Sequence, residues 1–246
     1  MKKIIVVLIF IFAAIQAMAQ TEPKTAEEYF NRGNAYFNQK EYDKAIADFS
    51  AALKINPNYA EAYNNRGNAY DDKKEYDKAI ADFTAALKIN FNYAEAYNNR
   101  GNAYIEKKEY DKAIADYTVA LKINPNYNKA YNNRGFAYVS IKEYDKAIAD
   151  YTAALKINPN YAEGFAHRGA VYFEQHQYDK AIVYFSAIIN VNPNNTKAFN
   201  YRAIAYTEKK EYDKAIADME AVLRINPNYP NAKENLEIIK KKRGSN

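Results

Sequence analysis

Residues 63–70 read Tyr-Asn-Asn-Arg-Gly-Asn-Ala-Tyr, and the same eight residues return unchanged at 97–104. Each copy follows the previous one by 34 residues, and close variants stand at 29–36, 131–138, 165–172 and 199–206. A fixed period of this length is typical of repeat proteins in which each repeat forms one supersecondary unit. The period predicts six units without insertions, at 26–59, 60–93, 94–127, 128–161, 162–195 and 196–229.

Each unit contains two amphipathic stretches around a short polar break. In the second unit, Tyr63, Gly67 and Tyr70 recur at helical spacing, and the stretch 76–87 is a second amphipathic helix pattern. Prolines stand near the ends of units, because proline cannot continue the preceding helix; they are Pro57, Pro125, Pro159, Pro193 and Pro227. The sequence therefore predicts a pair of helices in each unit and an all-α fold.

The repeated residues resemble those of the tetratricopeptide-repeat (TPR) family over 26–229. The shared pattern is an aromatic residue, Gly, Tyr, Ala, an aromatic residue, Ala and Pro, which in the first unit are Tyr29, Gly33, Tyr36, Ala45, Phe49, Ala52 and Pro57. The chain departs from this pattern at Phe91, Ile188, Ala203, Met219 and Val222. The resemblance implies a right-handed superhelical α-solenoid of stacked antiparallel helix pairs. Residues 230–243 would form a capping helix, followed by a tail at 244–246.

Two charged positions recur in register with the repeat. Arginine occupies one place in every unit, at Arg32, Arg66, Arg100, Arg134, Arg168 and Arg202. Aspartate follows sixteen residues later in all units but the fifth, which has Tyr184 there; the aspartates are Asp48, Asp82, Asp116, Asp150 and Asp218. We expect a structural ion pair that joins the two helices of a unit. The alternative is a ladder of arginines that binds a ligand.

The resemblance also implies that the first helix of each unit lines a concave groove, and asparagine holds several of its lining places. The candidate peptide-binding residues are Asn64, Asn65, Asn68, Asn98, Asn99, Asn102, Asn132, Asn133, Phe136 and Phe173. An asparagine amide offers two donors and an acceptor, so it can hold a peptide backbone without reading its sequence. Alternatively, repeat duplication has simply copied a neutral solvated face.

The expected lining changes along the chain. The ninth place of the unit is asparagine in the first three units and then becomes Phe136, Ala170 and Ile204. With Val139 and Phe173 nearby, these residues predict an apolar strip in the second half of the groove. Such a strip would desolvate an anchor side chain of the ligand. The alternative is that Phe136 and Phe173 pack inward against adjacent helices and present nothing to a ligand.

The expected lining is also acidic, with nine carboxylates opposed by Lys129 and Lys197; they are Glu27, Glu61, Asp71, Asp72, Glu95, Glu106, Glu163, Glu174 and Glu208. We therefore expect a basic or neutral peptide, and nucleic acid is disfavoured as a partner. The lysine and arginine with which some TPR proteins clamp acidic tails are replaced here by Phe30 and Asn99.

Catalytic signatures are scarce. The chain has no cysteine, and its histidines are His167, at the expected groove, and His176, at an expected turn. It carries no glycine-rich phosphate loop, nucleophile elbow or HExxH motif. We expect no enzymatic activity, no metal and no cofactor.

The first twenty residues have the order of a secretory signal peptide. A basic head, Met1 to Lys3, precedes an apolar run and the small residues Ala17 and Ala19. We predict a signal peptide at 1–19, a short segment at 20–25 and no integral membrane segment after cleavage; an uncleaved anchor is the alternative. The formal net charge is +5, but Lys2, Lys3 and residues 230–246 account for all of it.

Together these features favour an exported, noncatalytic scaffold for protein–protein interaction, located in the periplasm or secreted. The alternative is a module that binds carbohydrate or peptidoglycan of the cell envelope, because asparagine and tyrosine also suit sugar hydroxyls and ring faces.

The signal peptide gives a direct test. N-terminal sequencing of the exported protein should begin at Gln20, because small residues occupy the positions that signal peptidase requires. Recovery of a chain that retains Met1, in a membrane fraction, would contradict cleavage.

Overall fold

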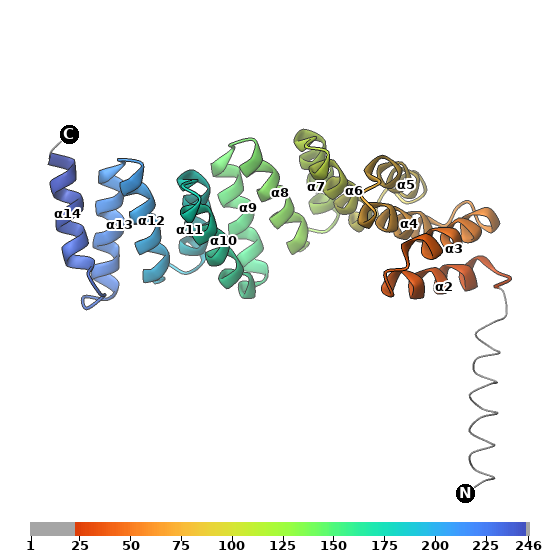
Figure 1. The fold of residues 1–246 in the computed structure, drawn as a ribbon, viewed down its shortest axis with the longest axis horizontal. Helices are drawn as coiled ribbons and strands as arrows, with labels where there is room; N and C mark the ends of the chain where they lie inside the picture. Colours follow the sequence, from red (N-terminus) through yellow and green to blue (C-terminus); the bar gives the residue numbers. More distant parts are fainter. Residues whose placement is uncertain (1–22, 245–246) are drawn as a thin grey trace, which may run out of the picture. The chain divides into compact units, whose positions relative to one another are not determined.

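The computed structural model describes residues 23–244, so the predicted signal peptide and most of the predicted tail lie outside the described residues. Within 23–244 the chain consists of α-helices and one short 3-10 helix, with no strand. It divides into two compact units, Met1–Phe91 and Asn92–Asn246. Figure 1 labels the helices. The predicted all-α fold of paired helices is confirmed.

The first compact unit contains two helix pairs. Its helices are α2 (Ala26–Asn38), α3 (Tyr42–Ile55), α4 (Ala60–Asp72) and α5 (Tyr76–Ile89). Helix α2 packs against α3, α3 packs against α4, and α4 packs against α5. Each helix therefore buries its apolar face against the next helix along the chain.

The second compact unit continues the same order. Its helices are α6 (Ala94–Glu106), α7 (Tyr110–Ile123), α8 (Asn128–Ser140), α9 (Tyr144–Ile157), η1 (Pro159–Tyr161), α10 (Ala162–Glu174), α11 (Tyr178–Val191), α12 (Thr196–Glu208), α13 (Tyr212–Ile225) and α14 (Ala232–Gly244). The last helix, α14, packs on α13 and buries Ala232, Leu236 and Ile239 there. Among the described helices, none combines the length and the apolar character that a bilayer span requires.

The polar break inside each pair is a tight turn with one residue in the left-handed region. These residues are Lys40, Lys74, Lys108, Lys142, His176 and Lys210. In the first pair, the N–H groups of Lys40 and Glu41 donate to the carbonyls of Phe37 and Tyr36, which satisfies the end of α2. His176 lies in such a turn, as expected, and its Nδ1 is 2.8 Å from the hydroxyl of Tyr178.

The repeated glycine allows the two helices of a pair to approach closely. A Cβ atom added at Gly67 would lie 2.7 Å from the Cε1 atom of Phe83, whose side chain is fully buried. The same contact recurs at Gly33, Gly101, Gly135 and Gly169. In the sixth unit, Ala203 and Met219 replace glycine and the aromatic residue, and both are fully buried. A flexible methionine thus makes room for the alanine methyl group.

The substitution Gly67→Ala should therefore destabilise the protein, although alanine is the better helix former. Overpacking costs about 1–3 kcal/mol, against a helix-propensity gain of about 1 kcal/mol. The double variant Gly67→Ala with Phe83→Met reproduces the sixth unit and should lose less stability than the sum of the two single changes. Denaturant unfolding of all four proteins checks this, and strictly additive losses would contradict the compensation.

The predicted arginine–aspartate pairing is confirmed in five of the six units. In the second unit, Nε and Nη2 of Arg66 each lie 2.7 Å from an oxygen of Asp82, whose carboxylate is buried. The other pairs are Arg32–Asp48, Arg100–Asp116, Arg134–Asp150 and Arg202–Asp218. These hydrogen bonds with Asp82 raise the pKa of Arg66 above its ordinary value. The forked, charge-assisted geometry is the strongest kind of side-chain hydrogen bond.

The same arginine also contacts the preceding unit. Nη1 of Arg66 donates to the hydroxyl of Ser50 at 2.9 Å. The equivalent contacts are Arg134 to Thr118 at 3.0 Å and Arg202 to Ser186 at 2.9 Å. One guanidinium group therefore joins the two helices of its own unit to the second helix of the unit before it.

Removal of one partner should be costly, because it leaves the other charge buried and unpaired. Arg66→Ala and Asp82→Ala should each lower the free energy of unfolding by about 3–5 kcal/mol. The double variant should cost clearly less than the sum. The pair Glu75–Lys78 on the surface is the control, and its coupling should be much weaker, because solvent screens it. A double-mutant cycle measures both couplings, and equal values would contradict a structural role for the Arg66–Asp82 pair.

Candidate functional site

The candidate asparagines differ in exposure. Asn64 and Asn98 are buried, with 0% and 3% of their surface exposed, so these two side chains do not line an accessible surface. The remaining candidate asparagines are half-buried: Asn65, Asn68, Asn99, Asn102, Asn132 and Asn133. In the second and third units the structure thus separates the fifth place from the sixth, which the sequence pattern treats alike, whereas in the fourth unit Asn132 and Asn133 are both half-buried.

Several of these amides bond to one another between neighbouring first helices. In the first compact unit, Nδ2 of Asn65 donates to Oδ1 of Asn34 at 2.8 Å. In the second, Nδ2 of Asn133 donates to Oδ1 of Asn102 at 2.9 Å and to Oδ1 of Asn98 at 3.1 Å. The repeated asparagines therefore have a structural role, since they connect consecutive first helices.

The expected apolar strip is only partly accessible. Phe136 is 36% exposed, whereas Val139 is buried at 2%. Phe173 is half-buried and packs edge-on against Tyr178, with ring centroids 5.4 Å apart. Val139 is buried because it packs into the core that α9 and α11 share. Phe136 is the member of the strip that reaches a cavity.

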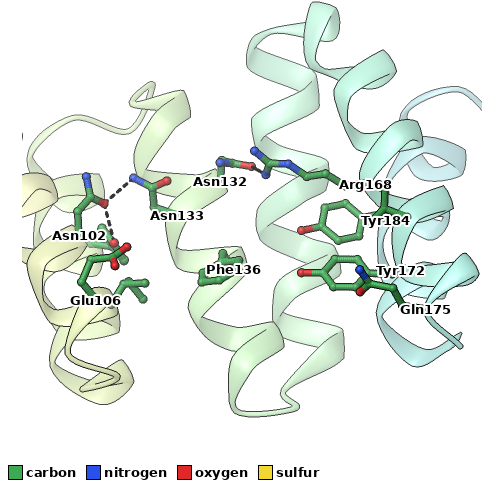
Figure 2. Close-up of a pocket in the computed structure, with 12 residues that line it drawn as sticks. Asn102, Glu106, Asn132, Asn133, Phe136, Arg168, Tyr172, Gln175 and Tyr184 are labelled. Atoms are coloured by element: carbon green, nitrogen blue, oxygen red, sulfur yellow. Dashed lines mark hydrogen bonds between the residues drawn. The ribbon is translucent and has the colours of Figure 1, made fainter. Parts of the chain in front are cut away.

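This cavity lies within the second compact unit and has a volume of about 670 Å³. We call it the α6–α10 cavity. Its polar lining residues are Asn102, Glu106, Asn132, Asn133, Arg168 and Gln175. Its apolar and aromatic lining residues are Ile105, Tyr117, Phe136, Val171, Tyr172 and Tyr184. Figure 2 shows α8 in the middle, with Asn102 and Glu106 on one side and Arg168, Tyr172 and Gln175 on the other. The volume is in the range of ligand sites.

Arg168 is one of several lining residues that the set of candidate peptide-binding residues lacks, and it is the one that carries a positive charge. Tyr184 stands where the other units have the paired aspartate. Among the side chains that the structure describes, no carboxylate pairs with Arg168, which is exposed and makes a long contact of 3.4 Å from Nη1 to Oδ1 of Asn132. The signal was present in the sequence, because the tyrosine at 184 breaks the register of the pairs.

The floor beneath Arg168 is aromatic. The hydroxyl groups of Tyr151 and Tyr184 lie 2.9 Å apart, and their rings stack at 4.7 Å. The ring of Tyr172 stacks on Tyr184 at 5.6 Å. Burial, and to a lesser extent the adjacent Tyr184, raises the pKa of Tyr172, so its hydroxyl stays neutral and can donate a hydrogen bond. This floor is therefore a stack of three tyrosine rings.

The opposite wall offers amide groups. Oδ1 of Asn102 accepts hydrogen bonds from the Tyr117 hydroxyl at 2.8 Å and from Asn133. Within 23–244, no protein group bonds to the Nδ2 donor of Asn102 or to the Oδ1 acceptor of Asn133. One donor and one acceptor are therefore left beside the exposed ring of Phe136, an arrangement that matches a peptide group with an apolar side chain.

Two residues expected at the groove are Glu163 and His167. The side chains of Glu163 and His167 lie outside the described residues. In the part of the chain that the structure covers, His, Asp and Glu form no group suited to holding a metal ion.

Several solved structures have a similar fold. The APC/C hetero-tetramer Cut9-Hcn1 matches at a TM-score of 0.58 with 19% identity, over 91% of this chain and 44% of that one. A tetratricopeptide repeat protein from Parabacteroides merdae matches at 0.56 with 21% identity, over 89% and 97%. YrrB, a TPR protein with an unusual peptide-binding site, matches at 0.51 with 24% identity, over 77% and 97%. The chain thus spans less than half the length of the first of these proteins. No curated protein matches the chain.

The repeats themselves match the sequence pattern of a known family. The description of that family is "Tetratricopeptide repeat", and it matches residues 26–59, 60–93, 94–127, 129–161 and 162–195. A second pattern with the same description matches residues 196–229. Six matched repeats cover most of the sequence, and the helix pairs of the structure coincide with them. The chain therefore belongs to the tetratricopeptide-repeat family.

Proposed function

We propose that this protein is an exported, noncatalytic scaffold that mediates protein–protein interaction by binding an extended peptide segment at the α6–α10 cavity. The observation that carries this proposal is the combination of an exposed Phe136 ring with an unused amide donor on Asn102 and an unused amide acceptor on Asn133. YrrB has a peptide-binding site, and we extend to this chain only that class of ligand.

In the proposed binding mode, the protein contacts both the main chain and an apolar side chain of the peptide. Asn102 donates to a carbonyl of the peptide and Asn133 accepts from an N–H, which holds the backbone without selecting its sequence. An apolar side chain of the peptide then rests on Phe136 and Val171, which are 36% and 37% exposed. Anchors of this kind usually contribute most of the binding free energy of an interface.

The charges on the first helices, of which Glu106 and Arg168 line the cavity itself, bear on the preferred composition of the segment. Exposed carboxylates on the first helices include Glu95, Glu106, Glu174 and Glu208, and the exposed lysines opposed to them are Lys129 and Lys197. These carboxylates favour a segment that is basic or neutral over most of its length. Export follows from the predicted signal peptide at 1–19, and it would place the partner in the periplasm or outside the cell.

A selection from a library of random peptides displayed on phage tests the proposal. Peptides enriched on the mature chain should lose at least about tenfold in affinity for Phe136→Ser, or about 1.4 kcal/mol. Phe91→Ser is the matched control, since Phe91 is 72% exposed and does not line the cavity. Circular dichroism confirms that both variants are folded, and fluorescence anisotropy measures affinity.

Two results would contradict the proposal. One is a failure to enrich any peptide. The other is an equal loss of affinity in the Phe136→Ser and Phe91→Ser variants, which would show that binding does not depend on the cavity.

A further inference from the structure

We propose that Arg168 binds a carboxylate of the peptide segment, so that the α6–α10 cavity selects a ligand with an acidic group beside its apolar anchor. This inference rests on the proposed peptide-binding function and specifies the ligand chemistry of the same site. The acidic group is either a side-chain carboxylate of the segment or the carboxylate at its C-terminus.

The first argument is that the fifth unit lacks the aspartate that pairs with the arginine between the two helices of the other units. The paired arginines, such as Arg134, direct Nε and Nη2 at an aspartate at 2.8 and 2.7 Å. Tyr184 stands at that place in the fifth unit, is buried, and bonds instead to the hydroxyl of Tyr151. The forked face of the Arg168 guanidinium is therefore not used as it is in the other units.

The second argument is the loss of the other partner. The hydroxyl of Thr118 accepts from Nη1 of Arg134, and Thr152 occupies the equivalent place before Arg168. Nδ2 of Asn190 donates to that Thr152 hydroxyl at 3.2 Å, in a position where the other units carry lysine or arginine. In the fifth unit the aspartate is therefore replaced by Tyr184, and the hydroxyl that would accept from the arginine is bonded to Asn190.

The setting of Arg168 suits an anion. A guanidinium group has five N–H donors in a fixed fork that fits a carboxylate with two parallel hydrogen bonds. The contact to Asn132, at 3.4 Å, is long and engages only Nη1. Tyr172 and Tyr184 line the same cavity, so a carboxylate bound by Arg168 would lie beside their rings.

The opposite wall favours a carboxylate over a phosphate. Glu106 lies on α6, across Phe136 from Arg168, as Figure 2 shows. A phosphate dianion is repelled by a nearby carboxylate and usually requires a cluster of arginines, whereas a single carboxylate is balanced by the single arginine. Glu106 also predicts the orientation of the segment, with its acidic group at α10 and a basic or neutral residue at α6.

Three synthetic peptide libraries test this inference and identify the source of the carboxylate. The first contains Asp and Glu but has an amidated C-terminus. The second lacks Asp and Glu but has a free C-terminus, and the third has no carboxylate at all. Binders should come from the first or the second library, and the productive library names the source. The third library should yield no binder of comparable affinity.

Variants at two positions locate the carboxylate contact. Arg168→Met should weaken the selected binders at least about tenfold, and Arg168→Lys should recover part of the loss. Tyr184→Asp restores the partner that the other units have, so it should also weaken binding while it keeps Arg168. Arg224→Met, which removes an exposed arginine on α13, is the matched control and should leave affinity unchanged.

A stability readout separates binding from a structural role. Arg168→Met should leave the denaturation midpoint close to that of the wild type, whereas Arg66→Ala should lower it clearly. The reason is that Arg66, unlike Arg168, neutralises a buried carboxylate. Binders from the third library that are insensitive to Arg168→Met would overturn the assignment of Arg168 and leave the peptide-binding function in place. No binder from any library would reject both. A large drop in midpoint for Arg168→Met would show that the arginine is structural.

Discussion

The forked ion pair between arginine and aspartate is the interaction on which the repeat depends. It joins the two helices of a unit at a place where the carboxylate is buried, and its third hydrogen bond, seen for Arg66, Arg134 and Arg202, reaches the preceding unit. A buried charge of this kind must be neutralised wherever it occurs. The exception in the fifth unit is therefore informative, because Tyr184 removes the need for neutralisation and leaves the arginine available.

The contact between the repeated glycine and an aromatic ring also couples two positions of the unit. Glycine faces an aromatic ring in the first five units, and alanine faces methionine in the sixth. Neither member of a pair can change alone without a clash or a cavity. The departures from the repeat pattern at Ala203 and Met219 thus compensate each other. In the fifth unit, Tyr184 replaces the aspartate and stacks on Tyr151, while Arg168 is exposed.

The fold could be predicted from the sequence almost completely, while the site could be predicted only in part. The period and the positions of Gly67, Phe83 and Asp82 determine contacts within one unit, and the pattern states those contacts directly. The sequence shows that Tyr184 deprives Arg168 of an aspartate, but the loss of its second partner depends on a contact with the neighbouring unit. The bond from Asn190 to Thr152, for example, spans 38 residues. A repeat pattern describes one unit at a time, so it does not predict contacts between units.

One further consequence concerns the number of repeats. The partners of each ion pair stand sixteen residues apart and belong to one 34-residue unit, so the insertion or deletion of a whole unit leaves every remaining pair intact. The stretches 63–70 and 97–104 are identical, so one early unit can take the place of another. Variation in copy number among the early units would then change the length of the array while it preserves the α6–α10 cavity, whose distinctive residues occur once.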